Sequence, residues 1–317
     1  MIKLDGLLSR LLQARSARTA LVPLMRAYIR YFPLQSGKPF VWRRIVDPYL
    51  AWEPRPFHAR TAFGFGVEGD SKDLIQQWLY YFGVWEPALT TWIRRRLRRG
   101  DVFVDVGANI GYFALLAARS VGPSGWVVAI EASPDIFERL RTNIGDNRVT
   151  NVRAIQAAAL GTRSTVRLYR GNDANCGETT IDEQYGGEFE GEVEAFPLQE
   201  LLTPDDVQAA RLIKIDTEGA EYSILAGFDG FDRLRDDAEL LVEMHPGYLA
   251  HRGESVDGIL ALTAAAGFHP YVLKEEYWAP AYLRNGCVVE APRRLAAPVT
   301  RDGTVLIFSR TDADRLE

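Results

Sequence analysis

Apolar and polar residues alternate along the chain in blocks that predict strands and helices in turn from about residue 100 onward. Short apolar runs predict seven strands, at residues 102–106, 126–131, 152–158, 211–216, 238–244, 269–273 and 304–309. Apolar positions at helical spacing predict helices at residues 110–120, 134–145, 219–228 and 255–266. Strands that alternate with helices in this way are typical of an α/β fold, in which crossover helices join the strands of a parallel sheet.

Two stretches depart from this alternation. Within residues 159–210, the segments 165–169 and 192–196 alternate like an additional pair of strands, and the polar, glycine-rich loop 171–191 separates them. Residues 1–60 are basic and interrupted by prolines, which predicts helices and irregular chain. We therefore expect a mostly helical N-terminal extension over residues 1–70 and an α/β domain over residues 71–317.

Charge is distributed unevenly along the 317 residues. Residues 1–60 contain eleven Lys and Arg against three acids, a net charge of +8, whereas the whole chain carries −5, so the remainder carries −13. A basic segment of this kind suits nucleic acid, an anionic membrane surface, or docking onto the chain's own acidic domain. Apolar residues at helical spacing in the same segment favour docking, so we expect no nucleic-acid partner.

Other features of the composition predict a cytoplasmic location. No run approaches 18 apolar residues, which excludes an evident transmembrane segment, and the N-terminal residues make a poor secretory signal. Cys176 and Cys287 are interpreted as two reduced thiols, because two cysteines cannot form a disulfide framework. A homodimer is one assembly that the sequence leaves open.

The segment 104–113 combines the end of a predicted strand, a glycine turn and the start of a helix. Gly107 and Gly111 allow a sharp turn and a close approach of a ligand to the backbone. Asn109 replaces the middle glycine of dinucleotide-binding loops and places a side chain where a pyrophosphate needs bare backbone. Asp105 repels phosphate and attracts an ammonium group. The loop therefore favours a nucleoside with a cationic amino-acid tail, such as S-adenosylmethionine.

A second acidic residue supports an adenosine-type cofactor. Glu131 ends the next predicted strand and follows Gly111 by 20 residues. At this separation an acidic residue accepts hydrogen bonds from the hydroxyls of a ribose. The glycine turn and the acid together predict a Rossmann-like cofactor site.

A second group of polar residues lies at the ends of the predicted strands 211–216 and 238–244. In an α/β sheet the carboxyl ends of the strands meet at one edge, so Asp216, Glu218, Glu243 and His245 are expected to gather there. We interpret Asp216, Glu243 and His245 as candidate catalytic residues. If a methyl group is transferred to a hydroxyl, His245 is the candidate base that removes the hydroxyl proton. Alternatively, Asp216 and Glu243 hold a divalent cation. A structural interpretation is a Lys214–Glu243 ion pair, with Asp216 capping the next helix.

Features that the sequence lacks narrow the kind of atom that could accept a methyl group from S-adenosylmethionine. The strand 211–216 is not followed by the Pro-Pro-aromatic pattern of adenine and glutamine nitrogen methyltransferases. Neither cysteine lies beside a proline, as a nucleophile toward cytosine C5 requires. Methylation of an oxygen atom is therefore the favoured chemistry.

Several segments together resemble the FkbM-type S-adenosylmethionine-dependent methyltransferases. They are residues 102–118, Glu131 with the following Ala-Ser-Pro, residues 213–221, residues 241–246, and the flanking stretches 80–87 and 193–201. The resemblance implies a Rossmann-like class I methyltransferase sheet, with six parallel strands and an antiparallel seventh. It also implies O-methylation of a hydroxylated small molecule, such as a secondary metabolite, a sugar or a polyketide-like compound.

The resemblance further implies which residues contact S-adenosylmethionine. The implied cofactor residues are Asp105, Gly107, Asn109 and Gly111 at the methionine end, Glu131 at the ribose, Ala132 and Ala157 beside the adenine, and Glu86 from the upstream segment. Where the family often has a polar side chain after the third strand, residues 157–159 are all alanine. Recognition of adenine at this place is therefore expected to use the backbone.

Two other functions remain open at this point. One is an NAD-dependent dehydrogenase, against which the side chain of Asn109 argues. The other is a non-catalytic cofactor-binding or scaffold protein, which the cluster of Asp216, Glu243 and His245 disfavours.

Overall fold

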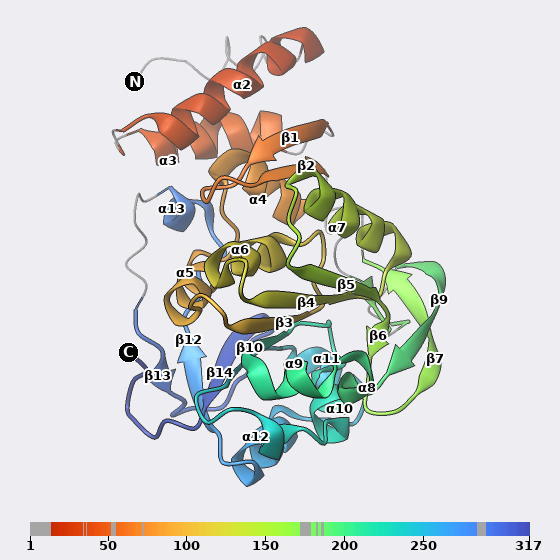
Figure 1. Ribbon diagram of the computed structural model, residues 1–317. Coiled ribbons are helices and arrows are strands. Elements are labelled where there is room, and N and C mark those ends of the chain that lie inside the picture. Colours follow the sequence, from red (N-terminus) through yellow and green to blue (C-terminus); the bar gives the residue numbers. More distant parts are fainter. Residues whose placement is uncertain are drawn as a thin grey trace. The chain divides into compact units, whose positions relative to one another are not determined.

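A computed structural model describes residues 14–33, 35, 37–51, 55–71, 73–171, 179–181, 183–184, 187–283 and 290–317 (Figure 1). Both cysteines and residues 172–178 of the predicted loop lie outside these ranges. The chain forms two compact units: Met1–Trp85 with Glu276–Val288, and Glu86–Glu275 with Val289–Glu317. The expected division into residues 1–70 and 71–317 stays a prediction. The first boundary between the two compact units falls between Trp85 and Glu86.

The larger unit is built on an eight-stranded sheet in the order β13-β12-β14-β11-β10-β3-β4-β5. Its strands are β3 (Val102–Val106), β4 (Trp126–Glu131), β5 (Val152–Gln156), β10 (Ala210–Ile215), β11 (Glu239–Met244), β12 (His269–Leu273), β13 (Arg293–Arg294) and β14 (Thr304–Ser309). The late strand β14 pairs antiparallel with both β11 and β12, and the neighbouring pairs from β11 to β5 are parallel. The predicted sheet of six parallel strands and an antiparallel seventh is confirmed, and the short edge strand β13 adds to it.

Helices cover both faces of this sheet. They are α5 (Pro87–Arg96), α6 (Tyr112–Val121), α7 (Pro134–Asp146), α8 (Leu198–Leu201), α9 (Pro204–Ala209), α10 (Glu221–Gly227), α11 (Pro246–His251) and α12 (Val256–Ala265), with a 3₁₀ turn at Phe231–Arg233. Figure 1 shows α6 and α7 on one face and α9, α10 and α12 on the other. Because both faces are covered, every residue of β3 and β10 is buried, which explains why both strands are mainly apolar on both faces.

The segment between β5 and β10 forms a second, four-stranded sheet in the order β6-β9-β7-β8. Its strands are β6 (Ala158–Ala159), β7 (Ser164–Arg170), β8 (Thr179–Thr180) and β9 (Glu188–Phe196). The predicted single strand 152–158 is wrong, because the chain leaves the main sheet after Gln156 and Ala158 pairs with Ala195 of β9. The predicted loop 171–191 is also too long at its end, since β9 already begins at Glu188.

The smaller unit contains α2 (Arg15–Tyr31), α3 (Lys38–Val41), a π-helix (Trp42–Ala51), β1 (Pro56–Arg60), β2 (Gly66–Asp70), α4 (Leu74–Phe82) and α13 (Ala279–Tyr282). The helical character of the N-terminal region is confirmed, and the β1–β2 hairpin was not predicted. The core of the smaller unit is aromatic. The ring centroid of Trp78 lies 4.2 Å from that of Tyr282, and Trp42 packs edge-on against Tyr81. None of the described helices is long and apolar enough to cross a bilayer.

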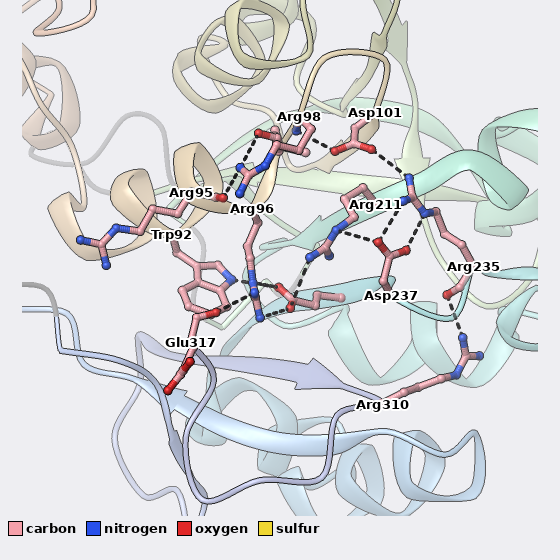
Figure 2. A network of polar contacts seen from close by, with 12 residues as sticks. Trp92, Arg95, Arg96, Arg98, Asp101, Arg211, Arg235, Asp237, Arg310 and Glu317 are labelled. Atoms are coloured by element: carbon pink, nitrogen blue, oxygen red, sulfur yellow. Dashed lines mark hydrogen bonds and ion pairs between the residues drawn. The ribbon is translucent and has the colours of Figure 1, made fainter.

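A network of ion pairs joins the amino ends of β3, β10 and β11 (Figure 2). Glu239 lies 2.6 Å from Arg96 and 3.7 Å from Arg211, and it accepts a hydrogen bond from the indole of Trp92. Arg235 continues the network by pairing with Asp101 at 2.9 Å. These contacts hold the strands together at the edge of the sheet opposite the candidate active site.

Candidate active site

The glycine loop after β3 has a backbone that only small residues tolerate. Gly107 and Gly111 have φ angles of +77° and +90°, and Asn109 also has a positive φ of 50°. A Cβ atom on Gly107 would lie 1.8 Å from the carbonyl oxygen of Asp216, because the end of β10 packs directly against the loop. Gly107 therefore serves a close approach of two backbones within the protein, in addition to any approach of a ligand.

Asp105 lies at the end of β3 with a side chain that is only 1% exposed. Neither of its carboxylate oxygens has a hydrogen-bond partner of ordinary geometry among the described residues. The nearest cation is the ammonium group of Lys214, 3.8 Å away. Burial raises the pKa of Asp105 to about 6, and the charge of Lys214 opposes that rise. The carboxylate is thus poorly compensated by the protein and available to another cation.

Glu131 ties the glycine loop to the end of β4. One carboxylate oxygen accepts a hydrogen bond from the amide of Asn109 at 2.8 Å, and the other accepts from the amide of Ser133 at 2.9 Å. Burial raises the pKa of Glu131 to about 7, and these amide hydrogen bonds limit the rise. Each carboxylate oxygen can accept a further hydrogen bond, so both can also receive ribose hydroxyls.

Lys214 lies among several carboxyl groups. Its ammonium group is 2.9 Å from Asp216 and also balances the charge of Asp105. Burial alone would lower the pKa of Lys214, but the charges of Asp216, Asp105 and Glu86 keep it above its ordinary value. The principal ion pairs of Lys214 are thus with Asp216 and Asp105 and not, as one interpretation of the sequence had it, with Glu243.

Glu243 and Asp216 are two buried carboxyl groups joined by a hydrogen bond. Burial and then the negative charge of Asp216 raise the pKa of Glu243 well above its ordinary value. Burial would also raise the pKa of Asp216, but Lys214 and a hydrogen bond from Glu243 hold it below the ordinary value. Of the two carboxyl groups, Glu243 is therefore the harder to ionise and Asp216 the easier.

His245 faces the site from the residue after β11. Its Nδ1 atom lies 3.4 Å from the carboxylate of Glu218, and its buried Nε2 atom has no hydrogen-bond partner in the described parts of the chain. Ligand atoms of Asp216, Glu218 and His245 lie within 4.8 Å of one another, close enough to share a divalent cation. Glu218 was expected at this edge, but no role was assigned to it from the sequence.

Glu221 organises the loop between β10 and α10. It is fully buried, and its carboxylate accepts hydrogen bonds from the amides of Thr217 and Gly219. The suggestion that Asp216 caps the next helix is wrong, because α10 begins after Ala220 without a side-chain cap. Sequence reasoning missed Glu221, although it stands within the acidic segment 216–221 and its position was a usable signal.

The remaining predicted cofactor residues lie near the same edge. The amide of Ala157 donates to the carbonyl of Glu131 at 3.1 Å, which places Ala157 and Ala132 at adjoining strand ends. Glu86 precedes α5 with a φ of 41° and is buried, and its charge acts on both Lys214 and Glu243. The structure therefore collects the predicted residues at the carboxyl edge of one sheet.

Comparison with known proteins decides the family. The profile described as Methyltransferase FkbM domain matches residues 105–270, more than half of the chain. The chain belongs to the FkbM-domain methyltransferases. The matched region includes the glycine loop, Glu131 and the Asp216–His245 cluster. Membership confirms the predicted family and the methyltransferase class, and the family implies S-adenosylmethionine as the cofactor.

Individual relatives of this FkbM-domain chain share part of its length. Methyltransferase sdnD of Sordaria araneosa is 29% identical over 155 residues, which are 40% of this chain and 60% of that protein. The 31-O-demethyl-FK506 methyltransferase FkbM of Streptomyces tacrolimicus is 30% identical over 209 residues, 54% of this chain and 74% of the relative. The crystal structure of M. jannaschii TYW2 in complex with AdoMet is 16% identical, covers 83% of this chain and 90% of its own, and has a TM-score of 0.41.

Proposed function

We propose that this protein transfers the methyl group of S-adenosylmethionine to a hydroxyl oxygen of a small molecule. The observation that carries the proposal is the buried carboxylate of Asp105 at the end of β3, for which the described part of the chain supplies no hydrogen bond of ordinary geometry. Lys214 lies 3.8 Å away and also pairs with Asp216, so the buried charge of Asp105 is only weakly compensated, and a cationic ligand reduces that cost. The ammonium and sulfonium groups of S-adenosylmethionine supply such a cation.

The cofactor residues divide by chemistry. Asp105 attracts the ammonium group, while Gly107, Asn109 and Gly111 let the methionine end lie against the backbone. Glu131 accepts hydrogen bonds from the ribose hydroxyls. Of the remaining cofactor residues, Glu86 adds negative charge, and Ala132 and Ala157 border the adenine with small apolar surfaces. S-adenosylmethionine supplies the electrophilic methyl carbon when bound.

We assign proton removal to His245. Bound S-adenosylmethionine would supply the methyl group and keep the sulfur as its leaving group, and Nε2 of His245 would accept the proton that the acceptor hydroxyl loses. Glu218 lies at Nδ1, so it orients the ring with its N–H toward the carboxylate and leaves the Nε2 lone pair for the acceptor. We also assign Asp216 and Glu243 to holding the acceptor hydroxyl.

A divalent cation is the alternative to a histidine base. Asp216, Glu218 and His245 are close enough to bind one, a different set from the Asp216 and Glu243 expected from the sequence. The ammonium group of Lys214, 2.9 Å away, already pairs with Asp216, and burial with neighbouring acids raises the pKa of Glu243, which opposes its ionisation. Both facts disfavour a cation and favour the base.

The Streptomyces relative and the sequence support the choice of acceptor classes to test. The Streptomyces relative is named for methylation of 31-O-demethyl-FK506, so polyketide-like alcohols are the first class to test, with sugars and other hydroxylated metabolites next. The cytoplasmic location, the homodimer and the absence of a nucleic-acid partner remain predictions from the sequence.

The test is a methyl-transfer assay against a panel of such hydroxylated compounds, with and without a chelator. We expect O-methylated product from at least one compound, undiminished by the chelator, and a loss of at least a hundredfold in kcat for His245→Ala with unchanged cofactor binding. Loss of activity on chelation, restored by Mg²⁺ or Mn²⁺, would instead show the cation. No cofactor binding by the wild-type protein would contradict the whole proposal.

A further inference from the structure

Glu190 is a buried acid on the second sheet for which the proposed reaction has no use. The pairing of β7 with β9 steps from Leu168–Gly191 to Tyr169–Phe189, so Glu190 is one extra residue on β9. Such a β-bulge turns a side chain away from its regular direction and is common beside active sites. The bulge explains how a glutamate on a largely exposed strand has a side chain that is only 5% exposed.

The Glu190 carboxylate is held firmly on one side. Its Oε1 atom accepts a hydrogen bond from the hydroxyl of Ser133 and lies 3.4 Å from the guanidinium of Arg170. Arg170 in turn pairs with Asp135 at 2.7 Å, at the start of α7. These contacts fix the position of the carboxylate and satisfy one of its two oxygens.

The second oxygen, Oε2, is buried and has no hydrogen-bond partner within the described ranges of the chain. A buried acceptor without a donor costs free energy, so a donor supplied by a ligand would be favoured. The carboxylate lies close enough to Glu131 for its charge to raise the pKa of that residue. Oε2 is therefore near the residue that we assign to the ribose.

The surroundings of Glu190 fit a heterocyclic base. A cavity of about 190 Å³ is lined by Pro134, Asp135, Arg170, Glu188, Phe189 and Glu190. The backbone that borders the adenine carries only alanines at residues 157–159, and β6 (Ala158–Ala159) is hydrogen-bonded to β9, the strand that carries Glu190. The second sheet thus brings a carboxylate toward the edge of the site where residues 157–159 offer no polar side chain.

We propose that Glu190 determines the specificity for the cofactor's base, with Oε2 accepting a hydrogen bond from the exocyclic 6-amino group of adenine. Ser133 and Arg170 act as positioning residues for this carboxylate. The inference rests on the proposed use of S-adenosylmethionine, and it replaces the expectation that the adenine is recognised through the backbone alone. A base with a carbonyl oxygen at position 6 would place an acceptor against an acceptor and be rejected.

The test compares two ligands that differ only at this position, S-adenosylhomocysteine and S-inosylhomocysteine, by isothermal titration calorimetry. We expect wild-type protein to bind the adenosyl compound about 10- to 100-fold more tightly. In Glu190→Gln the side-chain amide can donate to the 6-carbonyl, so this preference should fall at least tenfold. Glu192→Gln, an exposed glutamate on the same strand that does not line the cavity, is the matched control and should keep the wild-type preference.

Thermal melting of both variants shows whether the fold is intact, and the ratio of the two affinities stays informative even if both fall. A wild-type protein that binds S-adenosylhomocysteine but does not discriminate, or a Glu190→Gln variant that discriminates equally well, would overturn the role of Glu190 alone. A wild-type protein that binds neither compound would overturn the proposed function together with this inference.

Discussion

Asp105 and Glu131 are carboxyl groups whose burial opposes their own ionisation. Their pKa values of about 6 and about 7 lie above the ordinary values of 3.8 and 4.5. Between about pH 4 and pH 7 the unfolded chain therefore releases protons that the folded, cofactor-free protein retains. These two groups make the free energy of unfolding fall as the pH rises through this range. A cationic cofactor reverses the effect, because it stabilises the ionised carboxylates.

We predict that the affinity for S-adenosylmethionine falls with decreasing pH. At pH 5 about nine tenths of Asp105 is protonated in the free protein, so the affinity should be about tenfold lower than at pH 7.5. Calorimetric titration over this range measures the effect. In Asp105→Asn the affinity should be low and its pH dependence shallower, with Glu131 as the remaining group that titrates in this range, whereas an equally steep pH dependence in that variant would assign the effect to another group.

Among single residues, the sequence predicted those that stand at the end of a strand. Asp105 and Glu131 were found because a glycine turn and a spacing of 20 residues mark them. Glu221 and Glu190 were not, because one acts on the backbone of its own loop and the other is turned inward by a β-bulge. Neither effect has a periodic signature in the sequence.

At the scale of elements, the site depends on the contact between the glycine loop and the end of β10. We predict that Gly107→Ala removes cofactor binding and destabilises the protein by several kcal/mol, because the new Cβ would overlap the carbonyl of Asp216 at a positive φ. Thermal melting and calorimetric titration measure the two effects.

Gly145→Ala is the matched control for this change. Gly145 lies within α7, and an added Cβ meets no atom within 4 Å. Alanine should therefore stabilise the helix by about 0.5–1 kcal/mol and leave cofactor binding unchanged. If Gly107→Ala and Gly145→Ala had the same effects on thermal melting and on cofactor binding, the contact at Gly107 would be unimportant.

The elements themselves were predicted best where the main sheet buries them. β3, β4, β12 and β14 begin and end where the apolar runs do. The interpretation was wrong at β5 and β6, because the three alanines after Gln156 are apolar in either sheet. Only the pairing of Ala158 with Ala195 shows that the chain has changed sheets.

At the scale of the whole molecule, the larger unit separates stability from chemistry along its strands. The network in Figure 2 lies at the amino ends, and the candidate active site lies at the carboxyl ends. We predict that Glu239→Ala lowers the free energy of unfolding by roughly 3 kcal/mol, because it leaves Arg96 and the buried Arg211 without their shared carboxylate. Urea denaturation measures this loss, and the dissociation constant of the cofactor should not change.

Asp229→Ala removes an exposed ion pair with Arg233 on the same unit and is the comparison. It should change the free energy of unfolding by less than about 0.5 kcal/mol. A loss of cofactor affinity in Glu239→Ala would show that the two edges of the sheet are coupled, contrary to this separation.

The central claim is that the carboxyl edge beside Asp105 and Glu131 binds the adenosyl amino acid. A crystal structure with S-adenosylhomocysteine tests it most directly. We predict that the ammonium group lies beside Asp105 and that the ribose hydroxyls lie on Glu131. A ligand bound elsewhere, or carboxylates turned away from a ligand at this edge, would contradict it.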